Sequence, residues 1–263
     1  SASVGLVDRA RTAVMDARIT PALMDYVSRV SARLPSGVGV RFSTSEGDLV
    51  PRSRLRATSA LLSGPAGGVM ACQRLALQLG LPAVIGFDMG GTSTDVCRWA
   101  GELERRDSTE IGGYTVAVPT LDVVSVAAGG GSVLEIIDGR ARVGPSSAGA
   151  VPGPACYGRG GPAAITDANL VLGRLLPNRF PAVFGPGGAA RLDPDAAREA
   201  LARVAGRDAD LTAAAAGFVA LASEQMAEAI AALSTARGHD PRDHALIALG
   251  GAGAQHACGI ARR

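Results

Sequence analysis

Residues 86–96, GFDMGGTSTDV, bring an aspartate, two adjacent glycines and threonine hydroxyls together in one short segment. The apolar run AVIGFD predicts a buried strand that ends at Asp88, and the glycines after it predict a tight turn into a second strand. Because glycine has no side chain, its N–H group can approach a phosphate oxygen closely, and threonine hydroxyls add further donors. We therefore predict an anion-binding hairpin whose ligands are Gly90, Gly91, Thr92 and Thr94.

Two aspartates flank this hairpin and are candidate metal ligands: Asp88 before the glycines and Asp95 after them. Mg²⁺ keeps several of its waters and usually takes only one or two protein carboxylates, so this pair is sufficient for it. The alternative is a plain hairpin turn in which Asp88 accepts hydrogen bonds from nearby backbone groups. Two adjacent glycines are compatible with both interpretations.

A second glycine turn, GGAG at 250–253, follows the apolar run ALIAL and precedes AQHACGIARR. This order predicts a junction between a strand and a helix. The free N–H groups and the dipole at a helix start favour a phosphate or adenosine group. The predicted nucleotide contacts are Gly250, Gly251 and Gly253. The alternative is a strand–helix turn that binds nothing.

The pattern D-x-G-G-T-x-T-D resembles the second phosphate motif of actin, sugar kinases and heat-shock ATPases. As in those proteins, a helix rich in small residues is predicted before it, over 63–79, and a glycine turn follows it. The resemblance implies an α/β domain of the ribonuclease H-like class, with a mixed sheet flanked by helices and ATP at the glycine turns. We also expect a β-rich and loop-rich insertion at about 107–190, because glycine and proline are dense within it.

Longer segments resemble the hydantoinase A/5-oxoprolinase family. They are LLSGPAGGV at 61–69, LDVVSVAAGGGS at 121–132, the block at 143–175 and RGHD at 237–240, and the continuation at 180–186 favours the oxoprolinase branch. The resemblance implies a hydrolase that uses ATP and Mg²⁺ to activate the carbonyl of a lactam or hydantoin, after which water opens the ring. It implies catalytic roles for Asp88, Thr92 and Asp95, with Mg²⁺ held by the two aspartates.

Residues between the two glycine turns are candidate substrate contacts. They are Asp122, Gly130, Gly131, Ser132 and Asp167. Asp167, in ITDANL, is also suited to capping the helix that follows it. Cys156 is expected to be a small buried side chain, not a nucleophile, and His256 is expected to have a structural role.

The charge and cysteine content argue against several other classes of protein. Arginines and acidic residues nearly balance, 26 against 24, so no basic field is available for nucleic acid or an anionic membrane. Four cysteines lie far apart without a C-x-x-C pair, and no apolar run approaches about 18 residues. The chain also lacks the pattern of a signal peptide. We expect a cytoplasmic protein that binds a small molecule.

The order of predicted elements suggests two parts. Residues 1–54 are expected to hold a helix over 21–34, with Pro21 in its first turn, and a segment connecting it to a preceding lobe. Residues 55–263 are expected to form the ATPase lobe, with later helices at about 168–176, 194–205 and 212–237.

The chain has a single D-x-G-G-T motif, whereas the family resemblance implies a second one in an N-terminal lobe. We therefore expect the isolated chain to be inactive, and to need both that missing lobe and a hydantoinase B-type subunit. Three alternatives share much of this pattern: a subunit of an ATP-dependent ketone carboxylase, a sugar-kinase-like phosphotransferase, and an assembly lobe that no longer uses nucleotide.

Overall fold

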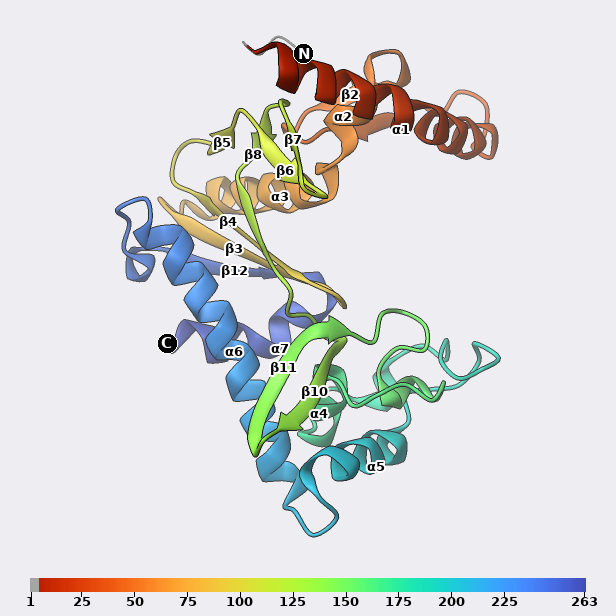
Figure 1. Cartoon of the computed structure of the whole chain (residues 1–263), viewed down its shortest axis with the longest axis vertical. Coiled ribbons are helices and arrows are strands. Elements are labelled where there is room, and N and C mark those ends of the chain that lie inside the picture. Colours follow the sequence, from red (N-terminus) through yellow and green to blue (C-terminus); the bar gives the residue numbers. More distant parts are fainter. Residues whose placement is uncertain (1–4) are drawn as a thin grey trace. The chain divides into compact units, whose positions relative to one another are not determined.

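A computed structural model describes residues 5–263 (Figure 1) and divides the chain into two compact units. The first unit comprises Ser1–Val84 and Cys97–Val123, and the second comprises Ile85–Val96 and Val124–Arg263. This division differs from the predicted boundary at residue 54. The difference arises because the chain leaves the first unit, forms residues 85–96 of the second, and returns, so the first unit is not continuous in sequence.

The first unit contains helices α1, Leu6–Ala32, and α3, Ser63–Leu79. α1 is longer than predicted and runs through Pro21. Tertiary contacts offset the cost of the proline, since both the N–H and the hydroxyl of Thr58 donate to Asp16 Oδ1, at 3.0 and 3.1 Å. The other elements are β1 (Arg41–Ser43), β2 (Leu49–Pro51), η1 (Arg52–Arg54), α2 (Ala57–Ala60), β5 (Arg105–Arg106), β6 (Thr109–Ile111), β7 (Tyr114–Val116) and β8 (Thr120–Leu121).

The second unit is built on a four-stranded mixed sheet with the order β12–β3–β4–β9. Strand β3, Val84–Met89, is buried along almost its whole length, as expected for an inner strand of an α/β sheet. The remaining strands of this sheet are β4 (Thr94–Trp99), whose last three residues are assigned to the first unit, β9 (Val123–Val126), whose first residue is too, and β12 (Ala245–Leu249). A separate antiparallel hairpin is formed by β10, Ser132–Ile137, and β11, Arg140–Ser147.

Four α-helices pack in the second unit, and their starts follow local sequence signals. Helix α5, Pro194–Ala205, has the predicted bounds, with Asp193 capping two N–H groups and Pro194 in the first turn. Helix α6, Leu211–Thr235, begins in the same way behind Asp210. The other two are α4 (Ile165–Val171) and α7 (Gly250–Ala261), and short 3₁₀ turns occur at η2 (Ala155–Tyr157), η3 (Pro177–Arg179) and η4 (Pro241–Asp243).

Helix α6 supplies much of the core of the second unit. By length and composition alone it is apolar enough to cross a membrane, and it is the one such helix among residues 5–263. Phe218, Met226 and Ile230 on this helix pack with Phe87 and Met89 of β3 in one buried cluster. Core packing therefore accounts for its apolar character.

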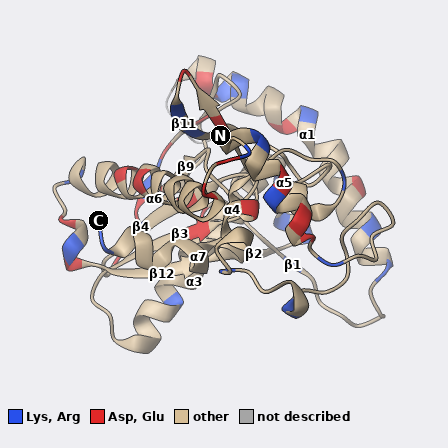
Figure 2. Ribbon diagram, turned by 90° about the horizontal axis from the view of Figure 1, so that it is seen from below, with Lys and Arg blue, Asp and Glu red and all other residues tan. Residues whose placement is uncertain are grey.

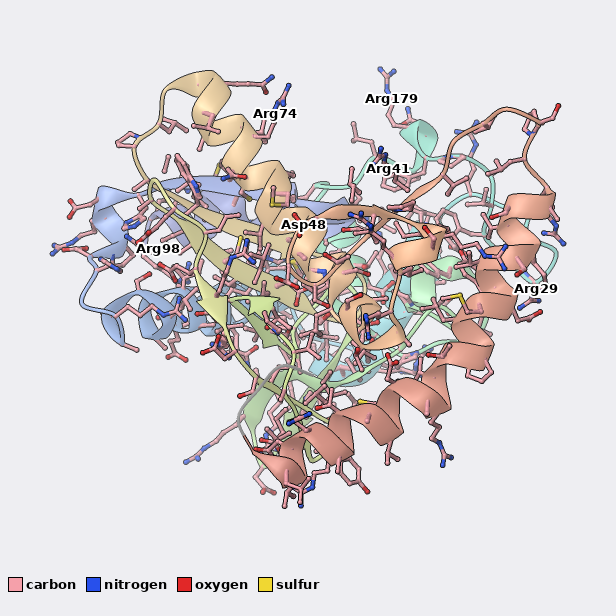
Figure 3. The ribbon with its side chains drawn as sticks, turned by 90° about the horizontal axis from the view of Figure 1, so that it is seen from above. Arg29, Arg41, Asp48, Arg74, Arg98 and Arg179 are labelled. Atoms are coloured by element: carbon pink, nitrogen blue, oxygen red, sulfur yellow. The ribbon has the colours of Figure 1, made fainter. Side chains whose placement is uncertain are left out.

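Charged side chains of both signs are mixed along the helices. Basic and acidic residues both occur on α1 and on α5 (Figure 2). Arg29 extends outward from α1 (Figure 3) and pairs with Asp25 at 3.1 Å, with both side chains largely exposed. Such exposed pairs contribute little to stability.

Candidate phosphate-binding site

The turn between β3 and β4 presents free backbone donors, as the glycine pattern predicts. It is closed by a hydrogen bond from Gly90 N–H to the Ser93 carbonyl at 3.0 Å, and Gly90, Gly91 and Thr92 are exposed. Within the described chain, the N–H groups of Gly91 and Thr92 donate to no acceptor. A Cβ added to Gly91 would meet nothing within 4 Å, so the space in front of the turn is open to an anion.

The second glycine turn lies directly against this hairpin. Gly250 has φ +79°, and a Cβ on it would come within 2.4 Å of both Asp88 Oδ1 and the Met89 carbonyl oxygen. Helix α7 starts at Gly250. As in any helix, its first N–H groups have no intrahelical acceptor, and Leu249 at the N-cap position provides no side-chain acceptor for them. The structure thus brings together the two glycine turns that the sequence predicts separately.

Asp88 and Asp95 form a pair of carboxylates beside these donors. Burial raises the pKa of Asp88, and the charge of Asp95 raises it further. The Asp88 carboxylate has no hydrogen-bond or ion-pair partner among residues 5–263, whereas Asp95 Oδ1 accepts from Ser125 Oγ at 2.5 Å. An unpartnered, half-buried carboxylate near a second one is suited to a cation. Mg²⁺ keeps several of its waters and usually takes one or two protein carboxylates, so this pair of aspartates fits it.

The structure gives two residues that were predicted as nucleotide ligands a different role. Thr94 is fully buried, and its hydroxyl donates to the Ala128 carbonyl at 2.5 Å, so it fastens the hairpin to the next segment. Gly253 is also buried, and a Cβ on it would lie 3.6 Å from the Phe87 carbonyl oxygen, so it allows α7 to pack closely on β3. Thr92, Gly250 and Gly251 are exposed at the turns, and their predicted roles stay predictions.

The glycine segment at 129–131, predicted to contact substrate, is buried and bonded to the phosphate turn. The N–H groups of Gly130 and Gly131 donate to the carbonyls of Gly90 and Gly91, at 3.0 and 2.6 Å. Ser132 is buried, and its hydroxyl accepts from Gly129 N–H at 2.8 Å. The segment therefore supports the phosphate turn from behind, with its polar groups already bonded inside the protein.

The two aspartates predicted as substrate contacts are also structural. Asp167 is fully buried, and its carboxylate accepts from the N–H groups of Ala155, Cys156 and Ala164 at 3.1, 2.7 and 2.8 Å. Burial raises its pKa, and these donors act against that rise. Asp122 belongs to the first unit, where it is buried and paired with Arg106. The helix-capping alternative for Asp167 is thus closer to what the structure shows.

Two other buried groups behave as expected. Cys156 is fully buried, and burial raises the pKa of its thiol, which disfavours the reactive thiolate. His256 is fully buried, with Nε2 3.1 Å from Asn169 Nδ2 and Nδ1 3.4 Å from Ser223 Oγ. Desolvation, with a contribution from Arg174, lowers its pKa to about 4, so the ring is neutral. Its contacts join α7 to α4 and α6.

Two residues that contact the candidate site were not predicted from the sequence. Ser125 holds Asp95, and Thr166 donates to the Gly130 carbonyl from both its N–H and its hydroxyl. Alternation along β9 indicates that Ser125 faces away from the core, but no local pattern indicates its partner. Thr166 lies 36 residues from Gly130, a separation that no motif spacing covers.

Two neighbouring glycine turns, one of them at an uncapped helix start, and a carboxylate pair beside an α/β sheet are features that fit a phosphate-binding domain. The Hydantoinase/oxoprolinase family model matches residues 9–263, so the chain belongs to this family. It is 45% identical to 5-oxoprolinase 1 of Arabidopsis thaliana over 277 residues, covering 98% of this chain and 22% of that protein.

Two solved structures resemble the chain. The ATP-dependent caprolactamase from Pseudomonas jessenii has a TM-score of 0.78 and 36% identity, covering 98% of this chain and 38% of that one. A nucleotide-free acetone carboxylase has a TM-score of 0.73 and 26% identity, covering 84% and 31%. The chain thus spans between about a fifth and two fifths of the length of these relatives.

Proposed function

We propose that this chain is the ATP-binding lobe of an ATP-dependent cyclic amidase of the 5-oxoprolinase or hydantoinase type. The observation that carries the proposal is the contact between Asp88 and Gly250, which joins the phosphate turn to an uncapped helix start. Family membership and the high identity to a 5-oxoprolinase support the cyclic-amide substrate. The order of a phosphate hairpin on an inner strand followed by a glycine turn supports the actin-like, ribonuclease H-like fold.

In this proposal the chain's own groups bind and orient the nucleotide. The N–H groups of Gly91 and Thr92 and the first N–H groups of α7 bind phosphate oxygens. Asp88 and Asp95 would hold hydrated Mg²⁺, which neutralises phosphate charge when bound. Ser125 fixes the orientation of Asp95 through its hydroxyl.

The chemistry that follows is activation of an amide. Transfer of a phosphoryl group from ATP to the lactam oxygen, with release of ADP, makes the carbonyl carbon susceptible to water. Attack by one water at that carbon then breaks the C–N bond, with a proton passing to the leaving nitrogen, and leaves the phosphate on the new carboxyl oxygen. A second water hydrolyses this acyl phosphate and frees inorganic phosphate. The N–H groups of the turn contribute by stabilising charge on the transferring phosphoryl group.

The partners are inferred from the relatives. A further relative is called caprolactamase subunit alpha, which indicates a protein of more than one subunit, and this chain covers 37% of it. We infer that this chain works with a second lobe that completes the ATP site and with a hydantoinase B-type subunit, in the cytoplasm.

Calorimetry with ATP·Mg²⁺ tests the proposal, on the isolated chain and on the complete enzyme. We expect weak binding by the isolated chain, and tight binding with ATP-dependent opening of 5-oxoproline, a hydantoin or another lactam by the complete enzyme. A complete enzyme that hydrolyses ATP with none of these would contradict the proposal.

A ketone carboxylase subunit is the second candidate, favoured by the likeness to acetone carboxylase. ATP hydrolysis that requires both bicarbonate and acetone or acetophenone would identify it. An assembly lobe would instead capture the hydantoinase B-type subunit in a pull-down and give no heat with nucleotide.

A further inference from the structure

Thr166, in the first turn of α4, makes two hydrogen bonds to a single carbonyl group. Its N–H and its hydroxyl donate to the Gly130 oxygen at 2.8 and 2.7 Å. A Cβ added to Gly130 would lie 2.9 Å from Thr166 Oγ1, so the two residues are already in close contact. Thr166 therefore fixes the position of Gly130.

Gly130 is in turn bonded to the phosphate turn. Its N–H donates to the Gly90 carbonyl, and the neighbouring N–H of Gly131 donates to the Gly91 carbonyl. The fit is tight, since a Cβ on Gly129 would come within 2.7 Å of the Gly91 carbonyl oxygen. A shift of this segment must therefore move the peptide groups whose N–H donors face outward.

Gly130 also faces the second glycine turn. A Cβ on Gly130 would lie 3.6 Å from the Cβ of Ala252, in the first turn of α7. A Cβ at residue 130 would thus point toward both Thr166 and Ala252. The phosphate turn and the first turn of α7 therefore both contact the glycine segment that Thr166 positions.

We propose that Thr166 is a positioning residue for ATP, one that sets the phosphate turn and the start of α7 through Gly130. The inference rests on the proposed function, because it presumes that these two turns bind the nucleotide. Thr166 has no role in contacting the nucleotide itself, since its hydroxyl is committed to the Gly130 carbonyl. Its loss should therefore change ATP binding and leave the cyclic-amide contacts unchanged.

The test compares Thr166→Val with Thr166→Ser in the complete enzyme. Valine removes the hydroxyl and keeps the shape, and the backbone N–H of residue 166 still satisfies the Gly130 carbonyl, so folding is preserved. We expect Thr166→Val to raise the KM for ATP·Mg²⁺ by about 3- to 10-fold, the scale of one lost hydrogen bond. Thr166→Ser should stay within about 2-fold of wild type because it keeps the donor.

A purely structural role would lower kcat through a smaller active fraction and leave both KM values unchanged. That result, or an equal rise in KM for the cyclic amide, would overturn the inference. Gly130→Ala provides a second variant, expected to raise the same KM because its Cβ would press on Thr166 Oγ1. Failure of the wild-type enzyme to use ATP with any cyclic amide would instead contradict the proposed function.

Discussion

The carboxylate of Asp88 and the backbone of Gly250 are in contact, so tightly that a Cβ at residue 250 would lie 2.4 Å from Asp88 Oδ1. The same Cβ would overlap the Met89 carbonyl oxygen, and φ at residue 250 is +79°. A left-handed conformation costs an L residue about 1–2 kcal/mol even without overlap. Only glycine therefore allows the helix start to approach the aspartate.

Gly250→Ala should weaken ATP·Mg²⁺ binding by at least about 10-fold, because relief of the overlap must separate the two turns. Gly217→Ala, at an exposed position of α6, is the matched control, since a Cβ there meets nothing within 4 Å. Binding by calorimetry is the measurement. Equal effects of the two substitutions would show that the contact with Asp88 has no part in binding.

Asp167→Asn should destabilise the protein by about 2–4 kcal/mol without a selective change in KM. The carboxylate accepts three backbone N–H groups in full burial, and an amide would turn an N–H donor toward some of them. Asp193→Asn is the control, because both of its bonds go to Oδ1, which asparagine retains. Urea unfolding measures the difference, and a stable Asp167→Asn variant with lost activity would favour a substrate role instead.

His256 should make the protein sensitive to mild acid. Its pKa falls from 6.5 to about 4 on folding, so the unfolded chain takes up the proton first as the pH drops. The free energy of unfolding should be unaffected above about pH 6.5 and should fall by about 3 kcal/mol between pH 6.5 and 4. Urea unfolding at a series of pH values measures this loss.

The His256→Gln variant should lose this pH dependence, whereas His239→Gln should keep it. The difference between the wild-type and His256→Gln curves isolates the histidine from Asp88 and Asp167, whose raised pKa values act in the opposite direction. Identical slopes for wild type and His256→Gln in this window would refute the assignment.

Features of the fold that depend on local patterns could be predicted from the sequence. The strand ending near Asp88, the turn at Gly90 and the helix start at Gly250 each follow from an apolar run meeting glycine. Helix α5 has the predicted bounds because Asp193 and Pro194 are strong start signals. Family membership was predicted as well, since long, compositionally unusual segments carry it.

The hydrogen bonds of several predicted site residues could not be foreseen, because they join distant segments of the chain. Thr94 was predicted as a phosphate ligand and Gly130 as a substrate contact. The Thr94 hydroxyl donates to the Ala128 carbonyl and the Gly130 N–H donates to the Gly90 carbonyl, and both partners lie in other segments. Asp167 has the position of a cap, yet two of its three donors come from the loop before it. The division into units also escaped prediction, because the first unit is discontinuous in sequence.

The central claim is that this chain binds the phosphates and the Mg²⁺ ion of ATP·Mg²⁺. It is tested most directly by Asp88→Asn in the complete enzyme. We predict that ATP-dependent ring opening falls by about 100-fold or more. The free energy of unfolding should be unchanged or higher, because burial and Asp95 disfavour the charge on Asp88. Asp208→Asn, at an exposed turn of the same unit, is the control and should keep full activity. Near wild-type ATP-dependent activity in Asp88→Asn would contradict the account.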